Sequence, residues 1–402
     1  MRHAGVIATA CAGLAASGLA AAGGPLALNS SGQPFTWPVG STIQYRTDGG
    51  PLSSSVSQNE ARARVAAMFQ VWEDVTSASL SYNRQGAITG VADGDVSTAA
   101  EYNAVEGACN NGTQSPIVFD VDGSLFEDLG QDSAVIGFAG PCAIGGNGQF
   151  IAGQAVMNGI FLDGISNANN LELTDNEFDA AFVHEFGHFS GLDHSQINVE
   201  CATGCSATDL DGLPTMFPFL VHESQRTLSI DDVAWFSRLH PAAGGAGFAA
   251  THGTITGTVY FSDGESHLQY ANVVARRVNA GGSEPRRFAV SAVSGYRFRT
   301  CTPNPITNPD LGFCPPSGSL DPAHIGLYEI PVPPGSYMIE VEPIDPSFTG
   351  GSSVGPSDFP IAMPGTPPGP FGPVVISAGS TSDGNDIVVG DTPPRFDQFE
   401  GS

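Results

Sequence analysis

Lysine is absent from this chain of 402 residues, and its 14 strongly basic residues, all arginine, face 41 aspartate and glutamate residues. The formal net charge is −27. Proteins that bind nucleic acid through its phosphates need a basic surface, and docking on anionic lipid headgroups needs clustered positive charge. The charge balance therefore argues against nucleic acid and anionic membrane surfaces as partners.

Long hydrophobic runs are also scarce, because only the first 22 residues contain one. After a short basic start, an Ala-rich apolar stretch runs from about Ala4 to Ala22 and ends in an A-x-A-like cleavage sequence. This pattern is typical of a secretory signal peptide, residues 1–22. The alternatives are a retained membrane anchor, for which the stretch is weakly apolar, or a lipoprotein site at Cys11. We therefore expect a secreted, extracellular protein with no membrane span after signal removal.

Cysteine is limited to seven residues, and loss of Cys11 with the signal leaves six. An even number of cysteines suits an oxidising compartment, although six cysteines allow 15 pairings. Their spacings do not form the pattern of a zinc cluster, and some of them could instead stay free and buried. Proximity in the sequence suggests the disulfides Cys109–Cys142, Cys201–Cys205 and Cys301–Cys314.

Residues 33–241 alternate helix and strand signals, which predicts an α+β domain. Three helix starts carry capping boxes, at Ser57, Thr174 and Ser229, each with an acidic residue three positions later. Val65, Met68, Phe69 and Trp72 repeat at helical spacing after the first of them. Strands are expected at about 78–82, 117–121 and 154–162.

The pattern changes after residue 241. Residues 242–251 are mostly Ala and Gly and are expected to form a linker. Short strand patterns separated by Gly and Pro turns then fill residues 252–391, which predicts an all-β sandwich. Within it, residues 350–372 are expected to form a long loop, and residues 392–402 are a tail.

The residues that carry chemistry lie in the stretch V-H-E-F-G-H-F-S-G-L-D-H-S, which ends at Ser195. His184 and His188 are four apart, so on a helix both imidazoles leave the same face. Two nitrogens at that separation can share one Zn²⁺. Glycine at Gly191 tolerates the left-handed turn that would bring His194 round as a third ligand. Three protein nitrogens leave one coordination position open for water, which is typical of a catalytic zinc site.

Glu185 is the candidate general base of this site. It is adjacent to the first ligand and three residues before the second, so it cannot easily be a further ligand. It is placed to take a proton from a water on the metal. A bare H-E-x-x-H also occurs by chance on ordinary helices, but here a glycine and a third histidine follow at the required spacing.

This stretch resembles the extended zinc signature of the metzincin metalloproteases, H-E-x-x-H-x-x-G-x-x-H. The Leu-Asp-His-Ser ending is similar to the matrixin branch, the matrix metalloproteases and their bacterial relatives. Metzincins also have a methionine turn beneath the metal, and Thr215-Met216-Phe217-Pro218 resembles it, which implies that Met216 is an apolar floor rather than a ligand. The resemblance covers about Phe35–Pro241 and implies a twisted mixed sheet with helices.

The chain departs from the matrixin pattern in three ways. Residues 23–183 contain no histidine, so the structural zinc site of vertebrate matrixins cannot form in its usual way. No cysteine lies between the signal and Cys109, so a cysteine-switch propeptide is not expected. Met216 follows His194 by 22 residues, longer than the matrixin pattern, and the insertion holds Cys201 and Cys205.

The later region resembles carboxypeptidase-regulatory-like, prealbumin-type β-sandwich domains. The residues that carry this resemblance are Gly253–Val259, Ala271–Ala275 and the stretches Gly326–Tyr328 and Pro334–Tyr337. These motifs are less specific than the zinc signature. They imply a second, all-β domain after the linker.

A second metal site is a weaker candidate. Asp120, Asp122 and Asp128 could bind Ca²⁺ through hard carboxylate oxygens. The alternative is an acidic turn after a strand.

The function expected from the sequence is a secreted zinc-dependent endopeptidase that hydrolyses protein or peptide substrates. The alternative is a secreted adhesion or carbohydrate-binding protein with a vestigial protease domain.

Apolar residues at 217–221 predict cleavage before apolar residues, unless Phe217 and Phe219 face the core and the insertion sets specificity. Because every proposed catalytic residue precedes the linker, a chain that ends near Ala242 is expected to cleave small peptides.

Overall fold

The computed structural model describes residues 5–6, 23–166, 171–206, 210–278, 288–298, 318–345 and 373–390. The part before residue 241 contains a five-stranded sheet with strand order β3-β2-β4-β6-β5. Four of its strands are parallel, and the edge strand β5 is antiparallel to β6. The strands are β2 (Thr42–Thr47), β3 (Ser81–Ala87), β4 (Pro116–Asp120), β5 (Gly137–Ile144) and β6 (Phe150–Asn158).

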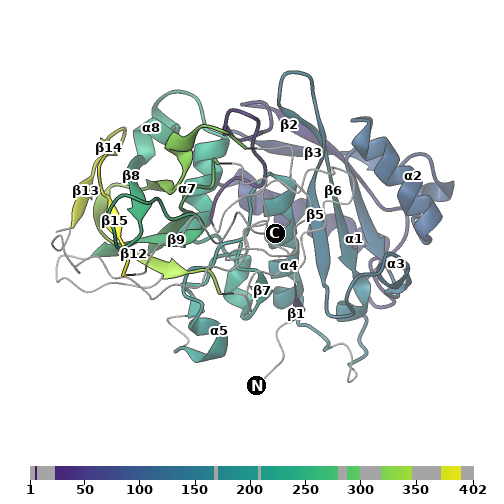
Figure 1. Cartoon of the computed structure of the whole chain (residues 1–402). Helices are drawn as coiled ribbons and strands as arrows, with labels where there is room; N and C mark the ends of the chain where they lie inside the picture. Colours follow the sequence, from purple (N-terminus) through teal and green to yellow (C-terminus); the bar gives the residue numbers. More distant parts are fainter. Residues whose placement is uncertain are drawn as a thin grey trace, which may run out of the picture.

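Helices cover both faces of this sheet (Figure 1). Alternating residues of β4 show why: Ile117 and Phe119 share a core with α1 and α4, whereas Val118 packs with α2 and α3. This period of two is expected for a strand buried on both faces. The helices are α1 (Gln58–Glu73), α2 (Ala99–Asn110), α3 (Ser124–Asp128), α4 (Asp175–Phe189) and α7 (Ile230–Leu239).

The three predicted capping boxes are confirmed at the starts of α1, α4 and α7. In each, the side chain of Ser57, Thr174 or Ser229 accepts from the backbone three residues later. The expected strands are present with shifted bounds, since β3 starts at Ser81 and β6 gives way to a 3-10 turn, η2 (Gly159–Leu162).

Four elements of this part, β2, β5, α2 and α3, were not predicted from the sequence. The helix α2 is capped by Thr98 without a capping box. Strand β5 contains Gly140 and Pro141, which read as turn residues. Proline is tolerated in β5 because this strand lies at the edge of the sheet.

Residues after 252 form two four-stranded sheets, with orders β10-β9-β12-β13 and β11-β8-β14; β15 also pairs with β8. Apolar residues of both sheets, such as Ile255, Val273 and Ile339, belong to one buried cluster. The strands are β8 (Gly253–Tyr260), β9 (Ala271–Val278), β10 (Ala289–Val293), β11 (Leu327–Val332), β12 (Gly335–Pro343), β13 (Val374–Ile376), β14 (Thr381–Ser382) and β15 (Ile387–Val388).

The connection between the two parts is partly ordered. The range expected to be a linker contains the turn η4 (Gly244–Ala246) and the short helix α8 (Phe248–Thr251). The other short elements are β1 (Gly5–Val6), η1 (Ala92–Gly94), α5 (Cys201–Gly204), β7 (Phe219–Leu220), η3 (Glu223–Arg226) and η5 (Pro322–His324).

Helix α7 joins the two parts of the chain into one continuous core. It lies between α4 and the C-terminal strands (Figure 1). The Trp235 indole N–H donates to the carbonyl of Ser291 on β10 at 2.7 Å, and the Ser291 N–H donates to Asp231 at 2.8 Å. Buried residues of both parts form a single hydrophobic cluster. The two parts therefore differ in sequence pattern but share a core.

Two of the three predicted disulfides are present. Cys109–Cys142 links the end of α2 to β5 with a Cα–Cα distance of 5.7 Å, and Cys201–Cys205 closes the insertion with a distance of 4.7 Å. The third predicted pair, Cys301–Cys314, lies outside the described residues, as do residues 350–372 and the tail. Within the described ranges, no helix is long and apolar enough to cross a membrane.

A buried acid lies at the end of β2. The Asp48 carboxylate is fully buried and accepts hydrogen bonds from Gly50 N at 2.8 Å and Phe119 N at 3.3 Å. Burial, and to a smaller extent the nearby Asp95, raises the pKa of Asp48 to about 7. The folded chain thus holds a proton on Asp48 that the unfolded chain releases near pH 4.

Replacing this acid by Asp48→Asn should reduce the pH dependence of stability. The protonated form stabilises the fold fully below the unfolded pKa, and this contribution is lost as the pH rises through about 7. Each unit of pKa difference corresponds to about 1.4 kcal/mol. Denaturant unfolding at pH 5 and pH 8 should show a larger loss of stability in the wild type than in the variant. Equal losses in both proteins would contradict this assignment.

Candidate metal centre

Helix α4 carries the candidate site and is held firmly along its length. Its stripe of phenylalanines is buried, as the sequence predicts, and Phe186 stacks on Phe69 of α1 at a ring distance of 3.7 Å. Two indole N–H groups donate to backbone carbonyls of the helix: Trp72 to Val183 at 2.9 Å and Trp37 to Phe189 at 3.1 Å. These contacts fix the axis and rotation of the helix, and with them the directions of its histidines.

The chain turns sharply after α4, as the motif predicts. Gly191 has φ +97°, and a Cβ at this position would lie 2.9 Å from the ring of Phe150. Both the backbone conformation and the close packing therefore require glycine. The turn returns the chain toward the helix and brings His194 back to the first two histidines.

The structure brings His184, His188 and His194 together in a fully buried group. The Nε2 atom of His194 lies 3.2 Å from that of His184 and 3.1 Å from that of His188. His184 Nδ1 lies 2.7 Å from the carbonyl of Thr215, and His188 Nδ1 lies 2.8 Å from the carbonyl of Leu192. A carbonyl only accepts, so in both rings Nδ1 carries the hydrogen and Nε2 presents a lone pair.

This arrangement fits a single metal ion. Tetrahedral ligands at the usual Zn–N distance of about 2.0–2.1 Å would lie about 3.3 Å apart, close to the observed separations. Burial lowers the pKa of His188 to about 4 and that of His184 well below its usual range, so both rings are neutral at pH 7. Neutral lone pairs that face one another repel, and a cation between them removes the repulsion. Among the described residues, these three histidines are the one group of at least three His, Cys, Asp or Glu side chains that could hold a metal ion.

Glu185 is also fully buried, and in the described part of the chain neither of its carboxylate oxygens has a hydrogen-bond partner. Its pKa is raised well above the usual range by burial. A buried carboxylate without partners is costly, which indicates a role other than stability. It packs against Gly137 of β5, where a Cβ would lie 3.2 Å from Oε1. This role of Gly137 was missed because β5 itself was not predicted.

The turn that contains Met216 lies under this group and is tied to α7. Asp232 accepts from the backbone N–H groups of Thr215 at 2.9 Å and Met216 at 3.1 Å. The Ser195 N–H donates to the carbonyl of Met216 at 2.7 Å. Asp232 was predicted only as a helix cap, so its second role, in holding the Thr215 carbonyl against His184, was missed.

Met216 itself packs under α4 because position 187 has no side chain. A Cβ on Gly187 would lie 2.2 Å from the sulfur of Met216 and 2.9 Å from the ring of Trp72. The F-G-H sequence within the motif thus makes room for the methionine. This supports Met216 as an apolar contact rather than a ligand.

The candidate calcium residues do not form a comparable group. Asp120 accepts from Gly123 N at 3.1 Å and Phe126 N at 2.8 Å, and Asp122 accepts from Ser124 N at 3.1 Å. Asp120 and Asp122 thus build the turn before α3, and among the described residues they do not form a group with Asp128 that could hold a metal ion. This matches the alternative of an acidic turn.

The insertion between His194 and Met216 packs on the chain after the methionine turn. Phe217 is fully buried in a small cluster with Cys201 and Leu213, and Phe219 packs partly buried against it. Phe217 therefore faces inward, as the second of the two sequence-based interpretations expects. The described part of the insertion thus packs against the residues that follow Met216.

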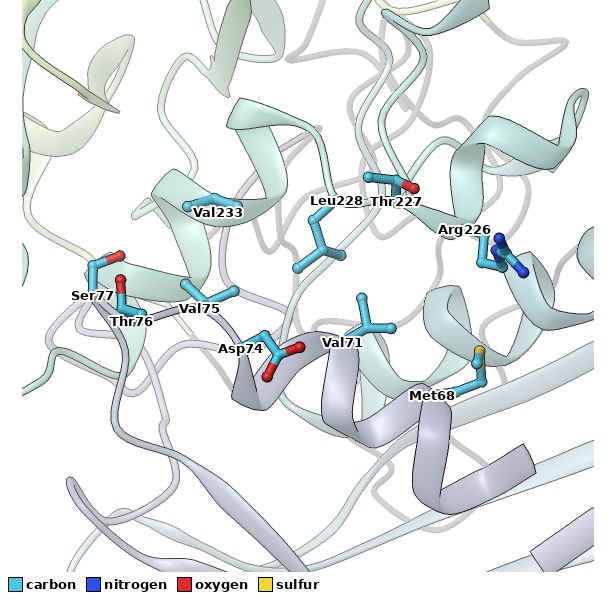
Figure 2. Close-up of a pocket in the computed structure, with 10 residues that line it drawn as sticks. All are labelled: Met68, Val71, Asp74, Val75, Thr76, Ser77, Arg226, Thr227, Leu228 and Val233. Carbon is cyan, nitrogen blue, oxygen red and sulfur yellow. The ribbon is translucent and has the colours of Figure 1, made fainter. Parts of the chain in front are cut away.

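A separate cleft of about 590 Å³ lies between α1 and the chain that leads into α7 (Figure 2). Its lining is mostly apolar, including Met68 and Val71 of α1, with Asp74 and Arg226 on the rim (Figure 2). None of its lining residues belongs to the metal centre. A large cleft thus exists apart from the histidines.

Neither a scan against protein-family models nor a search of curated proteins finds a match for this chain.

Adding one methyl group beneath the metal centre should be destabilising. We expect Gly187→Ala to lower the free energy of unfolding by about 1–3 kcal/mol through overpacking against Met216 and Trp72, and to weaken metal binding. The matched control is Gly107→Ala in α2, where a Cβ meets nothing within 4 Å. That change should be neutral or stabilising by up to about 1 kcal/mol. Denaturant unfolding of both variants tests this; equal stabilities would contradict the packing argument.

Proposed function

We propose that this protein is a secreted zinc-dependent endopeptidase of the metzincin, matrixin-like type. The single observation that carries the proposal is the buried group of His184, His188 and His194, with the unpartnered carboxylate of Glu185 on the same helix. A structural zinc site does not need such a carboxylate, whereas a hydrolytic one needs a general base. On this proposal, the two C-terminal sheets are the prealbumin-like sandwich.

Each residue has a defined part in this chemistry. The three histidines hold the ion through Nε2, while the Thr215 and Leu192 carbonyls fix the orientation of two of the rings. A bound Zn²⁺ supplies Lewis acidity, which polarises a carbonyl oxygen and lowers the pKa of water. Glu185 accepts a proton at its carboxylate and passes it to the leaving amine.

Peptide binding is supported by the pairing of β1 with β7. Gly5–Val6 pairs antiparallel with Phe219–Leu220, close in sequence to Met216. An extended backbone can therefore add to this edge, which is one of the common modes of peptide recognition. Gly5–Val6 belongs to the predicted signal peptide, and its removal frees β7 for a substrate.

The variant Glu185→Ala should keep the metal but lose at least about two orders of magnitude in peptidase rate, because a general base contributes about 10²–10⁴-fold. Metal content and turnover of a quenched peptide measure both effects. Glu177→Gln is the matched control, since Glu177 is an acidic residue of the same helix that completes its capping box, which glutamine can also do. Turnover like that of the wild type in Glu185→Ala would overturn the proposed role, and an inert wild type would favour the adhesion alternative.

Cleavage is expected before Leu, Phe, Ile or Met, with Asp and Glu rejected. Phe217 faces inward, but the apolar residues Phe219 and Val221 are only partly buried, so burial of an apolar substrate side chain against them gains about 25 cal/mol per Å². An acidic side chain would lack a counter-charge there, and the net charge of −27 repels it. Sequencing the new N-termini from a peptide library decides this, and a preference for Asp or Glu would show that this surface does not contact the substrate.

A further inference from the structure

Residues 196–198 follow closely after His194, and each of them contacts the C-terminal sheets or the chain that follows β12. Gln196, Ile197 and Asn198 are buried, and each uses a different kind of contact. This stretch leads from His194 into the insertion. Its position is therefore set by strands that are far away in the sequence.

Gln196 makes a reciprocal pair with the backbone that follows β12. Its Oε1 accepts from Asp345 N at 2.9 Å, and its Nε2 donates to Asp345 O at 3.3 Å. Ile197 then packs in a small buried cluster with Val274 of β9 and Ala289 of β10. The contact of Gln196 is thus polar, and that of Ile197 is apolar.

Asn198 links the C-terminal sheets to both ends of the insertion. Its Oδ1 accepts from Arg276 of β9 at 2.6 Å, and its Nδ2 donates to the carbonyl of Gly212 at 2.9 Å. Its φ of +61° is left-handed, which asparagine tolerates better than most residues. One amide group therefore connects β9, the chain after His194, and the chain that leads to Thr215.

Arg276 is itself fixed in place. It forms ion pairs with Glu340 and Glu342 of the neighbouring strand β12, and its side chain is only 8% exposed. A guanidinium held by two carboxylates presents its remaining N–H in a defined direction. Arg276 can therefore fix the position of the Asn198 amide.

We infer that the C-terminal sheets position the metal centre through Arg276 and Asn198, with Gln196 and Ile197 as supporting contacts. Arg276 and Asn198 are positioning residues that hold His194 and the Thr215 carbonyl in register with α4. This inference rests on the proposed zinc site but not on peptidase activity. On this inference, a chain that ends near Ala242, which the sequence predicts to cleave small peptides, should hold zinc less firmly than the full-length chain.

The test uses the full-length chain carrying Asn198→Gly, which removes the amide but keeps a backbone that adopts positive φ. Loss of an outer partner of a metal ligand typically costs about 10–100-fold in affinity. Asn198 acts on the histidines through the backbone that follows His194, so we expect an effect at the lower end of this range. Zinc transfer to a chelator should become about tenfold faster. The absorption spectrum of the Co²⁺-substituted protein should also change, and kcat should fall more than KM rises.

Two further variants separate positioning from simple destabilisation. Asn198→Asp keeps an acceptor for Arg276 and should recover part of the zinc retention. Arg297→Ala is the control, because Arg297 forms a similar ion pair, with Glu329, in the same C-terminal part but is not part of the Arg276–Asn198 contact. It should leave the chelator rate and the Co²⁺ spectrum unchanged.

The outcomes are distinct from those that test the proposed function. Wild-type chelator rates and an unchanged Co²⁺ spectrum in Asn198→Gly would overturn the inference, as would equal changes in Arg297→Ala. If the wild type binds one zinc but cleaves no peptide, the proposed function fails while these comparisons still decide the inference.

Discussion

Three buried imidazole rings whose Nε2 atoms meet constrain the rest of this structure. Burial lowers the pKa of His184 and His188 and keeps both rings neutral, and the Nε2 atom of His194 lies 3.1–3.2 Å from theirs. Such an arrangement is unfavourable without a cation between the rings. The surrounding fold must therefore hold all three rings rigidly enough to keep a binding site formed.

That rigidity comes from three directions. Helix α4 is fixed by the indoles of Trp37 and Trp72 and by the stacked phenylalanines. Asp232 of α7 fixes the methionine turn, and the C-terminal sheets contact the chain after the third ligand. Since α7 also contacts β10 directly, both parts of the chain act on the same centre.

The sequence predicted what depends on local spacing. The histidines, Gly191, the three capping boxes and two disulfides follow from residues that lie close together along the chain, and the structure contains each of them. The helical spacing of apolar residues also predicted which face of α1 packs in the core. These features depend on helix periodicity and turn chemistry, which a single sequence displays directly.

Contacts between distant segments were not predictable in the same way. Gly137 and Gly187 matter because of what a Cβ would meet, and that depends on how β5 and Met216 pack against α4. The pairing of Asn198 with Arg276 joins residues 78 positions apart, and no local pattern marks either of them. The three histidines thus lie on a local motif, while the contacts that support them are tertiary.

X-ray absorption at the zinc edge, on the purified full-length protein, tests the central claim most directly. The account predicts one zinc per chain, with three imidazole nitrogens at about 2.0–2.1 Å and one further light-atom ligand. A protein that retains no zinc, or a zinc with sulfur ligands, would contradict it.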